Sequence, residues 1–140
     1  MIPTQCRVAH DPENGKFGDC VRACVAAILE KSPDDVPHFY HDNPDPRVAD
    51  ERIREYLDGL GFAAYWSVFD PATTFVELMD WQRVNNPGVH FMLYHSNGEN
   101  DHVVVCRGGE VVCNPAWGAS PIVGPSYSAD AWGVMVIALK

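Results

Sequence analysis

The sequence predicts an α+β fold in which helices come first and an antiparallel sheet follows. Apolar residues recur at helical spacing over residues 20–30 and 47–59, and short β-rich runs separated by turns fill most of the chain after residue 90. Helices and antiparallel strands in separate parts of the chain are typical of this class. A length of 140 residues suits one core, so we expect a single domain over residues 1–140.

Three helices are predicted before residue 90. The segment from Cys20 to about residue 30 is apolar on all sides, which indicates a helix buried in the middle of the domain, and Asp19 is expected to be its N-cap. A second helix is expected over about residues 47–59, and a third begins after Thr73 or Thr74. The residues of the third helix that are expected to face inward are Phe75, Val76, Met79 and Trp81.

The remaining segments read as strands and turns. Val103, Val104 and Val105 are apolar on both faces of their strand, so this strand is expected to be central in the sheet. Residues 116–132 are rich in Pro, Gly and Ser and are expected to form a surface excursion. The predicted strands are Phe62–Phe69, His90–His95, His102–Cys106, Glu110–Cys113 and Gly133–Leu139.

Composition and charge exclude several classes of function. The formal net charge of −9 disfavours nucleic-acid binding, which needs clustered Lys and Arg. No apolar run approaches the ~20 residues that span a bilayer, and the first residues contain neither a basic nor an apolar signal region. We therefore expect a cytoplasmic protein that binds neither nucleic acid nor membrane. The oligomeric state is left open.

The five cysteines are expected to be reduced thiols, because no secretory signal accompanies them. Cys24, Cys106 and Cys113 lie in apolar patterns typical of core residues. Cys20 differs because it combines polar neighbours with a position at the start of a helix. The thiolate is the reactive form of cysteine, and a helix N-terminus together with a nearby imidazolium stabilises it. Cys20 is therefore the candidate nucleophile.

His102 and Asn114 are the candidate partners of this thiol. His102 opens a strand at a rim of the sheet, where its side chain can enter a cleft, and Asn114 follows the next strand. If residues 107–109 form the hairpin loop, the two lie directly opposite each other and the amide can hold the imidazole. A two-residue turn at Gly108-Gly109 instead puts them on opposite faces, unless a bulge intervenes. His95 is the alternative base if the strand register differs.

These motifs resemble the papain-like cysteine peptidases. The resemblance rests on Gly18-Asp19-Cys20 at the start of an apolar helix, His102-Val-Val-Val in a strand, and Asn114-Pro115 after the next strand. It is nearest to the branch that processes bacteriocin leader peptides and to the small relatives of that branch in bacteria and phages. The resemblance implies a papain-like fold, in which the nucleophile lies on the central helix and that helix packs on a C-terminal antiparallel sheet.

The resemblance also implies a function and a set of site residues. The expected function is cysteine-dependent hydrolysis of a peptide or related amide bond, with a peptide or protein substrate and no cofactor. A Gln upstream of the nucleophile belongs to the family pattern; here it is Gln5, separated from the nucleophile by residues 6–18, and Val21 stands where Gly is common. The implied catalytic residues are Cys20 as nucleophile, His102 as base, Asn114 as its orienter and Gln5 as an oxyanion donor.

Two other interpretations compete with hydrolysis. One is a catalytically silent papain-like module that binds a protein partner, since fold does not dictate function. The aromatic residues that could line its recognition groove are Trp66, Trp81, Trp117, Trp132, Tyr40, Tyr94 and Tyr127. The other is a zinc site near the N-terminus, because zinc prefers thiolate and imidazole ligands. The four residues with suitable spacing are Cys6, His10, Cys20 and Cys24.

Overall fold

The computed structural model describes residues 1–118 and 120–140 and has the α+β architecture expected from the sequence. Its helices are α1 (Cys20–Leu29), α2 (Pro46–Gly59) and α3 (Phe75–Asn85), with short 3-10 turns at Pro12–Asn14 and Pro33–Asp35. Its strands are β1 (Phe62–Phe69), β2 (His90–Ser96), β3 (Asp101–Arg107), β4 (Glu110–Cys113), β5 (Gly124–Pro125) and β6 (Trp132–Leu139).

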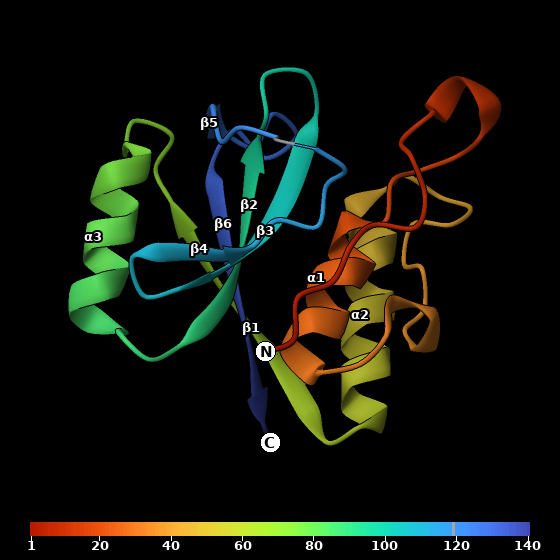
Figure 1. Ribbon diagram of the computed structural model, residues 1–140, viewed down its shortest axis with the longest axis horizontal. Helices are drawn as coiled ribbons and strands as arrows, with labels where there is room; N and C mark the ends of the chain where they lie inside the picture. Colours follow the sequence, from red (N-terminus) through yellow and green to blue (C-terminus); the bar gives the residue numbers. More distant parts are fainter. Residues whose placement is uncertain (119) are drawn as a thin grey trace.

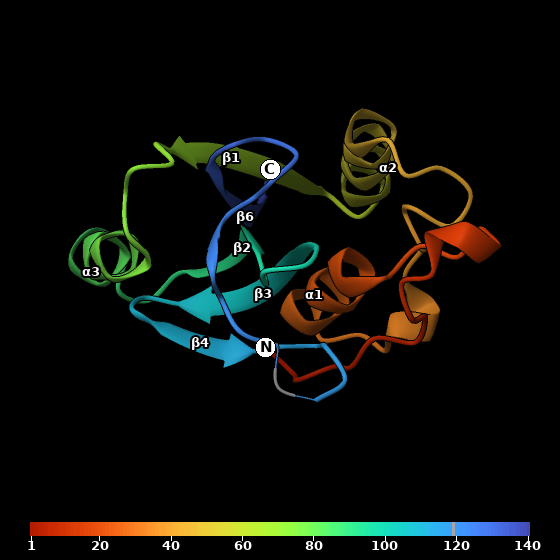
Figure 2. The ribbon, with the colours of Figure 1, turned by 90° about the horizontal axis from the view of Figure 1, so that it is seen from above.

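One antiparallel sheet organises the molecule. Its strand order is β1-β6-β2-β3-β4, and the short β5 pairs with the end of β2. The sheet lies between α3 on one face and α1 with α2 on the other (Figures 1 and 2). Because side chains alternate along a strand, each central strand contributes to two cores. Met92, Val103 and Val105 face α1 and α2, whereas Leu93 and Val104 face α3.

Local sequence signals explain where the helices begin. The Asp45 carboxylate accepts a hydrogen bond from Arg47 N at the start of α2. Thr74 and Glu77 form a capping box at the start of α3, in which each side chain accepts a hydrogen bond from the other residue's backbone N–H. Helix α1 has almost no polar face, and its residues 23–27 are fully buried between the sheet and α2.

Two of the four residues expected to face inward on α3 do not. Val76 and Trp81 do not face inward: both are exposed, and α3 packs on the sheet through Leu78 and Met79. Phe75 and Met79 do pack in the core on this side of the sheet, as expected. The described residues of the segment 116–132 lie largely at the surface, as expected, but they also include the short β5 and part of the lining of a cleft.

The β3–β4 hairpin determines how His102 meets Asn114. The turn contains only Gly108 and Gly109, so the shorter of the two alternatives is the one observed. Between Val105↔Cys113 and Cys106↔Val111 the register shifts, and Val112 is the extra residue of a β-bulge. The bulge restores the alternation that the shorter turn would have broken, and His102 and Asn114 therefore share a face.

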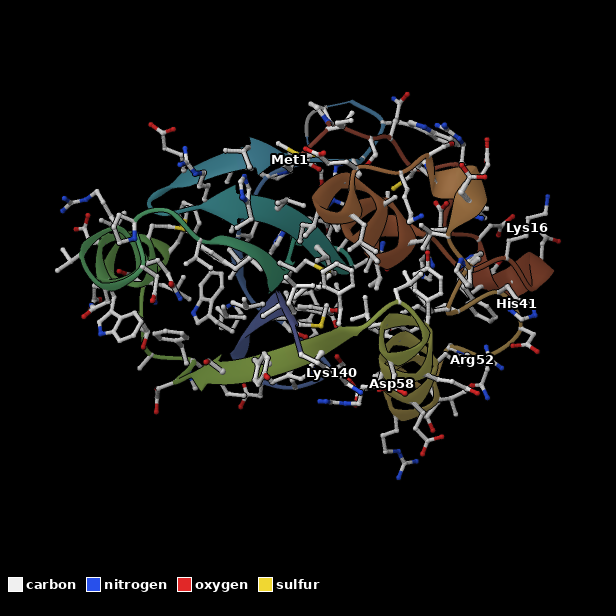
Figure 3. All side chains as sticks on the ribbon, turned by 90° about the horizontal axis from the view of Figure 1, so that it is seen from below. Met1, Lys16, His41, Arg52, Asp58 and Lys140 are labelled. Atoms are coloured by element: carbon white, nitrogen blue, oxygen red, sulfur yellow. The ribbon has the colours of Figure 1, made fainter. Side chains whose placement is uncertain are left out.

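The C-terminal strand ends beside α2. Lys140 forms an ion pair with Asp58 near the end of this helix, and both residues are labelled in Figure 3. His41 and Arg52 lie on the same side of the molecule, away from α3. Across the part of the chain that the structure describes, no helix has the length and apolarity needed to cross a membrane.

Candidate active site

Cys20 is the first residue of α1, as the sequence indicated. Its side chain is half-buried and lies against β3: the backbone of Val103, the residue after His102, is hydrogen-bonded to the thiol. Burial raises the pKa of Cys20 to about 11, although this backbone contact lowers it in part; the Asp19 carboxylate adds to the rise. The thiol therefore rests in its protonated form at neutral pH.

His102 and Asn114 are in direct contact. His102 Nε2 lies 3.0 Å from Asn114 Oδ1, and the imidazole is 8% exposed. The amide cannot rotate freely, because Oδ1 also accepts a hydrogen bond from Ala116 N and Nδ2 donates one to Ser120 O. Since Nε2 donates to an amide oxygen, Nδ1 is left unprotonated and can act as a base.

Burial also affects the charge of His102. It lowers the pKa of this imidazole below its usual value, and the hydrogen bond to Asn114 opposes that shift. With the His102 pKa lowered and the Cys20 pKa raised, the resting pair is a neutral thiol and a neutral imidazole rather than thiolate and imidazolium. The base must then take the proton as the sulfur attacks.

A cleft of about 740 Å³ connects these groups. Cys20, His102 and Val103 contribute to its wall, and Trp117 lies at its edge with 55% of its surface exposed. Segments far apart in the sequence meet here: the N-terminal segment, the start of α1, the end of β2, the start of β3, and the loop after β5. A cleft with a thiol and an imidazole in its wall has the layout that covalent catalysis requires.

Asp19 has a different role from the N-cap that its position suggested. Its carboxylate makes no cap hydrogen bond to α1. The side chain is fully buried and accepts hydrogen bonds from the backbone N–H groups of Arg7 and Val8 and from the Arg22 guanidinium, 2.7 Å away at the nearest nitrogen. Asp19 thereby holds residues 7 and 8 of the N-terminal segment beside the start of α1. These hydrogen bonds lower its pKa even though burial opposes the shift.

Gln5 is not placed where an oxyanion donor would act. Its side chain is exposed, and Gln5 is not among the described residues that line the cleft. The neighbouring Cys6 lines the cleft instead, with its backbone N–H bonded to Pro115 O. The backbone groups in contact with the thiol belong to Val103 in β3 and to Cys20 and Val21 at the start of α1.

The zinc interpretation does not agree with the structure. Over residues 1–118 and 120–140, no three His, Cys, Asp or Glu side chains gather in a geometry that could hold a metal ion. Cys24 is fully buried and donates to Val103 O, and His10 Nδ1 accepts a hydrogen bond from Gly18 N. The i, i+4 spacing of Cys20 and Cys24 thus places one thiol in the cleft and the other in the core.

His95 lies directly opposite His102 in the β2–β3 ladder. The two rings meet edge to face, with centroids 5.5 Å apart. His95 is fully buried, and its Nδ1 donates to Ser96 O. Burial lowers its pKa to about 4; the hydrogen bond to Ser96 opposes this shift, and His102 adds to it. His95 is therefore neutral at pH 7 and belongs to the support of His102.

The buried, neutral His95 is expected to make folding stability depend on pH. The pKa of a His in an unfolded chain is ~6.5, whereas the pKa of His95 in the folded protein is about 4. Between these two pH values the unfolded chain binds a proton at His95 and the folded chain does not. The stability due to neutral His95 is full above pH ~6.5 and falls by about 3 kcal/mol as the pH drops to about 4. Chemical denaturation of wild type and His95→Phe across this range measures it: the variant's curve should be flatter, and parallel curves would contradict the assignment.

Comparison with known proteins gives no match: no family model fits the chain, and no curated protein or solved structure is significantly similar to it. The case for the site therefore rests on the geometry and chemistry of its own residues.

Proposed function

We propose that this chain is a papain-like, cysteine-dependent hydrolase that cleaves a peptide or related amide bond. The observation that carries the proposal is the 3.0 Å contact between His102 Nε2 and Asn114 Oδ1, next to a cysteine that opens α1 in the same cleft. A nucleophile, a base and a group that orients the base are the parts that covalent acyl transfer requires.

The mechanism follows from which atoms are free. His102 Nδ1 takes the proton of the Cys20 thiol as the sulfur attacks the carbonyl carbon, and Asn114 holds the imidazolium that forms. Backbone N–H groups at the start of α1 stabilise the oxyanion. The imidazolium then gives its proton to the leaving amine, and the amine departs. Water attacks the thioester that remains, and its hydrolysis releases the acid and frees the thiol.

The burial of Cys20 favours a second candidate, a catalytically silent papain-like module that binds a protein partner. A thiol whose pKa is raised to about 11 is unreactive unless a base acts on it. The two candidates differ in whether His102 activates Cys20, which the reactivity of the thiol measures directly.

The first test is the alkylation rate of all five cysteines with iodoacetamide between pH 5 and 10, with each adduct located by peptide mass spectrometry. We expect Cys20 to react at least about tenfold faster than any other thiol at pH 7, because a base assists it. The acid limb of its profile should lie below pH ~6.5, because the His102 pKa is lowered and the neutral imidazole persists there.

A variant of His102 shows whether Cys20 reacts fast because His102 activates it or only because its thiol is accessible. His102→Ala should slow Cys20 by about tenfold or more and leave the rate at half-buried Cys6 unchanged. If Cys20 is alkylated no faster than Cys6, and its rate is the same in His102→Ala as in wild type, hydrolysis by this pair is excluded. The binding module then becomes the better account.

A further inference from the structure

Two buried polar atoms lack a hydrogen-bond partner among the described residues, and both belong to the wall of the cleft. They are Tyr94 Oη and His95 Nε2. Folded proteins rarely leave such atoms unpaired, because each costs stability, and those that persist cluster at functional sites. His95 Nε2 carries no proton, since Nδ1 donates to Ser96 O, so it can only accept a hydrogen bond.

Aromatic side chains line the part of the cleft that contains Tyr94. The Trp66 and Tyr94 rings pack with centroids 4.8 Å apart, and Tyr40 lines the cleft beside them. Gly133, opposite Tyr94 in the ladder, makes this packing possible: a Cβ there would lie 3.2 Å from Tyr94 Cβ and 3.4 Å from the Trp66 ring. These three rings form what is called below the aromatic pocket. Such a pocket accepts an apolar chain, and its faces attract a cation.

Groups near the phenol place the aromatic pocket beside the nucleophile. Burial raises the pKa of Tyr94 well above its usual value, and Tyr40, Cys24, Cys20 and Asp50 add to the rise. Asp50 is fixed at the pocket because its Oδ1 accepts a hydrogen bond from Trp66 Nε1 at 3.1 Å. The Trp66 ring therefore connects the Asp50 carboxylate to Tyr94 in the wall of the cleft that also contains Cys20.

The charged Asp, Lys and Arg side chains among the described residues that line the cleft are all negative. The described residues that line it include Asp19, Asp50 and Asp101 but no Lys or Arg. Arg22 and Arg54 pair with the first two, whereas Asp101 takes its hydrogen bonds from uncharged donors in residues 126–128. The negative charge of Asp101 is thus not neutralised, which favours a cationic ligand and repels a carboxylate.

We propose that the aromatic pocket takes a Lys or Arg side chain of the substrate, its stem between Tyr40, Trp66 and Tyr94. The cationic end donates to Tyr94 Oη and Asp50. The proposal rests on the proposed function for the position of the scissile bond, but the pocket itself is tested separately from cleavage.

Cleavage of a positional-scanning library of tetrapeptide coumarin amides measures the preference. We expect one position at which Lys or Arg exceeds Leu by about tenfold and Glu by about 100-fold in kcat/KM. A library profile that favours Leu, Phe or Glu at every position overturns the proposal.

Tyr94→Phe removes only the unpaired hydroxyl and gives two readouts. Its kcat/KM on the Lys and Arg substrates should fall about tenfold relative to that on Leu substrates, because a hydrogen bond to a charged group is lost. Its Tm should equal that of wild type or exceed it by up to about 4 °C, because a buried unpaired group disappears. Tyr65→Phe is the matched control: Tyr65 is 57% exposed on β1, and neither readout should move. A lower Tm with unchanged selectivity overturns the proposal.

Asp50→Asn is the second variant. It keeps an acceptor for Trp66 Nε1 while removing the charge, so the preference for Lys and Arg over Leu should fall at least about threefold. An unchanged preference would show that the carboxylate does not contact the substrate, which contradicts the proposal.

Binding separates the pocket from catalysis. Calorimetry on the Cys20→Ala variant uses acetylated tetrapeptide amides with Lys, Leu or Glu at each position of an Ala background. We expect the Lys peptide to bind at least about tenfold tighter than the Glu peptide, and Tyr94→Phe to reduce that ratio. Equal affinities, or no binding by any of them, overturn the pocket. Failure of the proposed function is a different result: wild type and Cys20→Ala then cleave the library equally.

Discussion

Replacing Cys20 by Ala is expected to abolish amide hydrolysis and to leave the fold intact. Cys24, four residues later in α1, cannot take its place because it is fully buried and donates to Val103 O. Losing a catalytic nucleophile costs up to about 10⁶-fold in kcat, so we expect activity to fall at least about 10⁴-fold. The fold should survive because the half-buried side chain loses only its sulfur.

The same assay should rank the other members of the site. His102→Ala removes the base and should cost nearly as much as Cys20→Ala, since the thiol is protonated at neutral pH. Asn114→Ala should cost less, about 10- to 100-fold, because Asn114 orients the base and does not itself take the proton. Hydrolysis of the coumarin amides by purified variants measures this order.

Cys24→Ala is the matched control for Cys20→Ala. It removes a thiol from the same helix, in the core rather than in the cleft, so it should lower thermal stability and leave kcat/KM of the folded protein close to that of wild type. Full activity in Cys20→Ala would exclude the mechanism, whereas equal losses in the two variants would point to damage of α1.

The helices and strands could be predicted because local signals agree with their environment. An all-apolar helix after Asp19, a Thr-x-x-Glu capping box at Thr74 and three consecutive valines in β3 each have one good structural solution. The exposed side of α3 could not be predicted with the same certainty. Its sequence places apolar residues all round, and only packing against β2 and β6 decides that Leu78 is buried and Trp81 is not.

The contact between His102 and Asn114 shows where sequence reasoning stops. Two glycines after Arg107 permit either a two-residue or a three-residue loop, and these put the partner on opposite faces. The observed turn is the shorter one, and the extra residue is accommodated at Val112. Nothing in the local sequence marks Val112 as a bulge, because the bulge depends on how β4 lies against β3.

The residues that hold the site in place, Asp19 and His95, could not be recognised as such from the sequence. Asp19 has the spacing of a helix cap, and only the folded chain brings Arg7 and Val8 to its carboxylate. His95 looked like an alternative base, and its complete burial shows otherwise. Both depend on contacts between distant segments, which residue types and periodicity do not specify.

Asp19→Ala is expected to destabilise the protein by about 3–5 kcal/mol, because it leaves the partly buried Arg22 guanidinium without its partner and two backbone N–H groups unpaired. Urea denaturation measures the free energy of unfolding. The matched control is Asp45→Ala at the start of α2: Asp45 also pairs with an Arg, but on the surface, and its removal should cost far less. Equal losses in the two variants would contradict the role assigned to Asp19.

The pH dependence of folding stability distinguishes the contribution of the Asp19 charge from that of its hydrogen-bond acceptors. The folded pKa of Asp19 lies below its usual value, so the stability it contributes is complete above pH ~4 and is lost as the pH falls through the lowered pKa. Asp19→Asn keeps an acceptor for Arg7 or Val8 but loses the charge that faces Arg22. It should lose part of the stability at pH 7 and show a shallower decline below pH ~4 than wild type. Asp19→Asn should also weaken the hydrogen bonds that hold residues 7–8 beside the residue that precedes Cys20. We expect Cys20 to become less buried in this variant, and its alkylation rate should therefore increase.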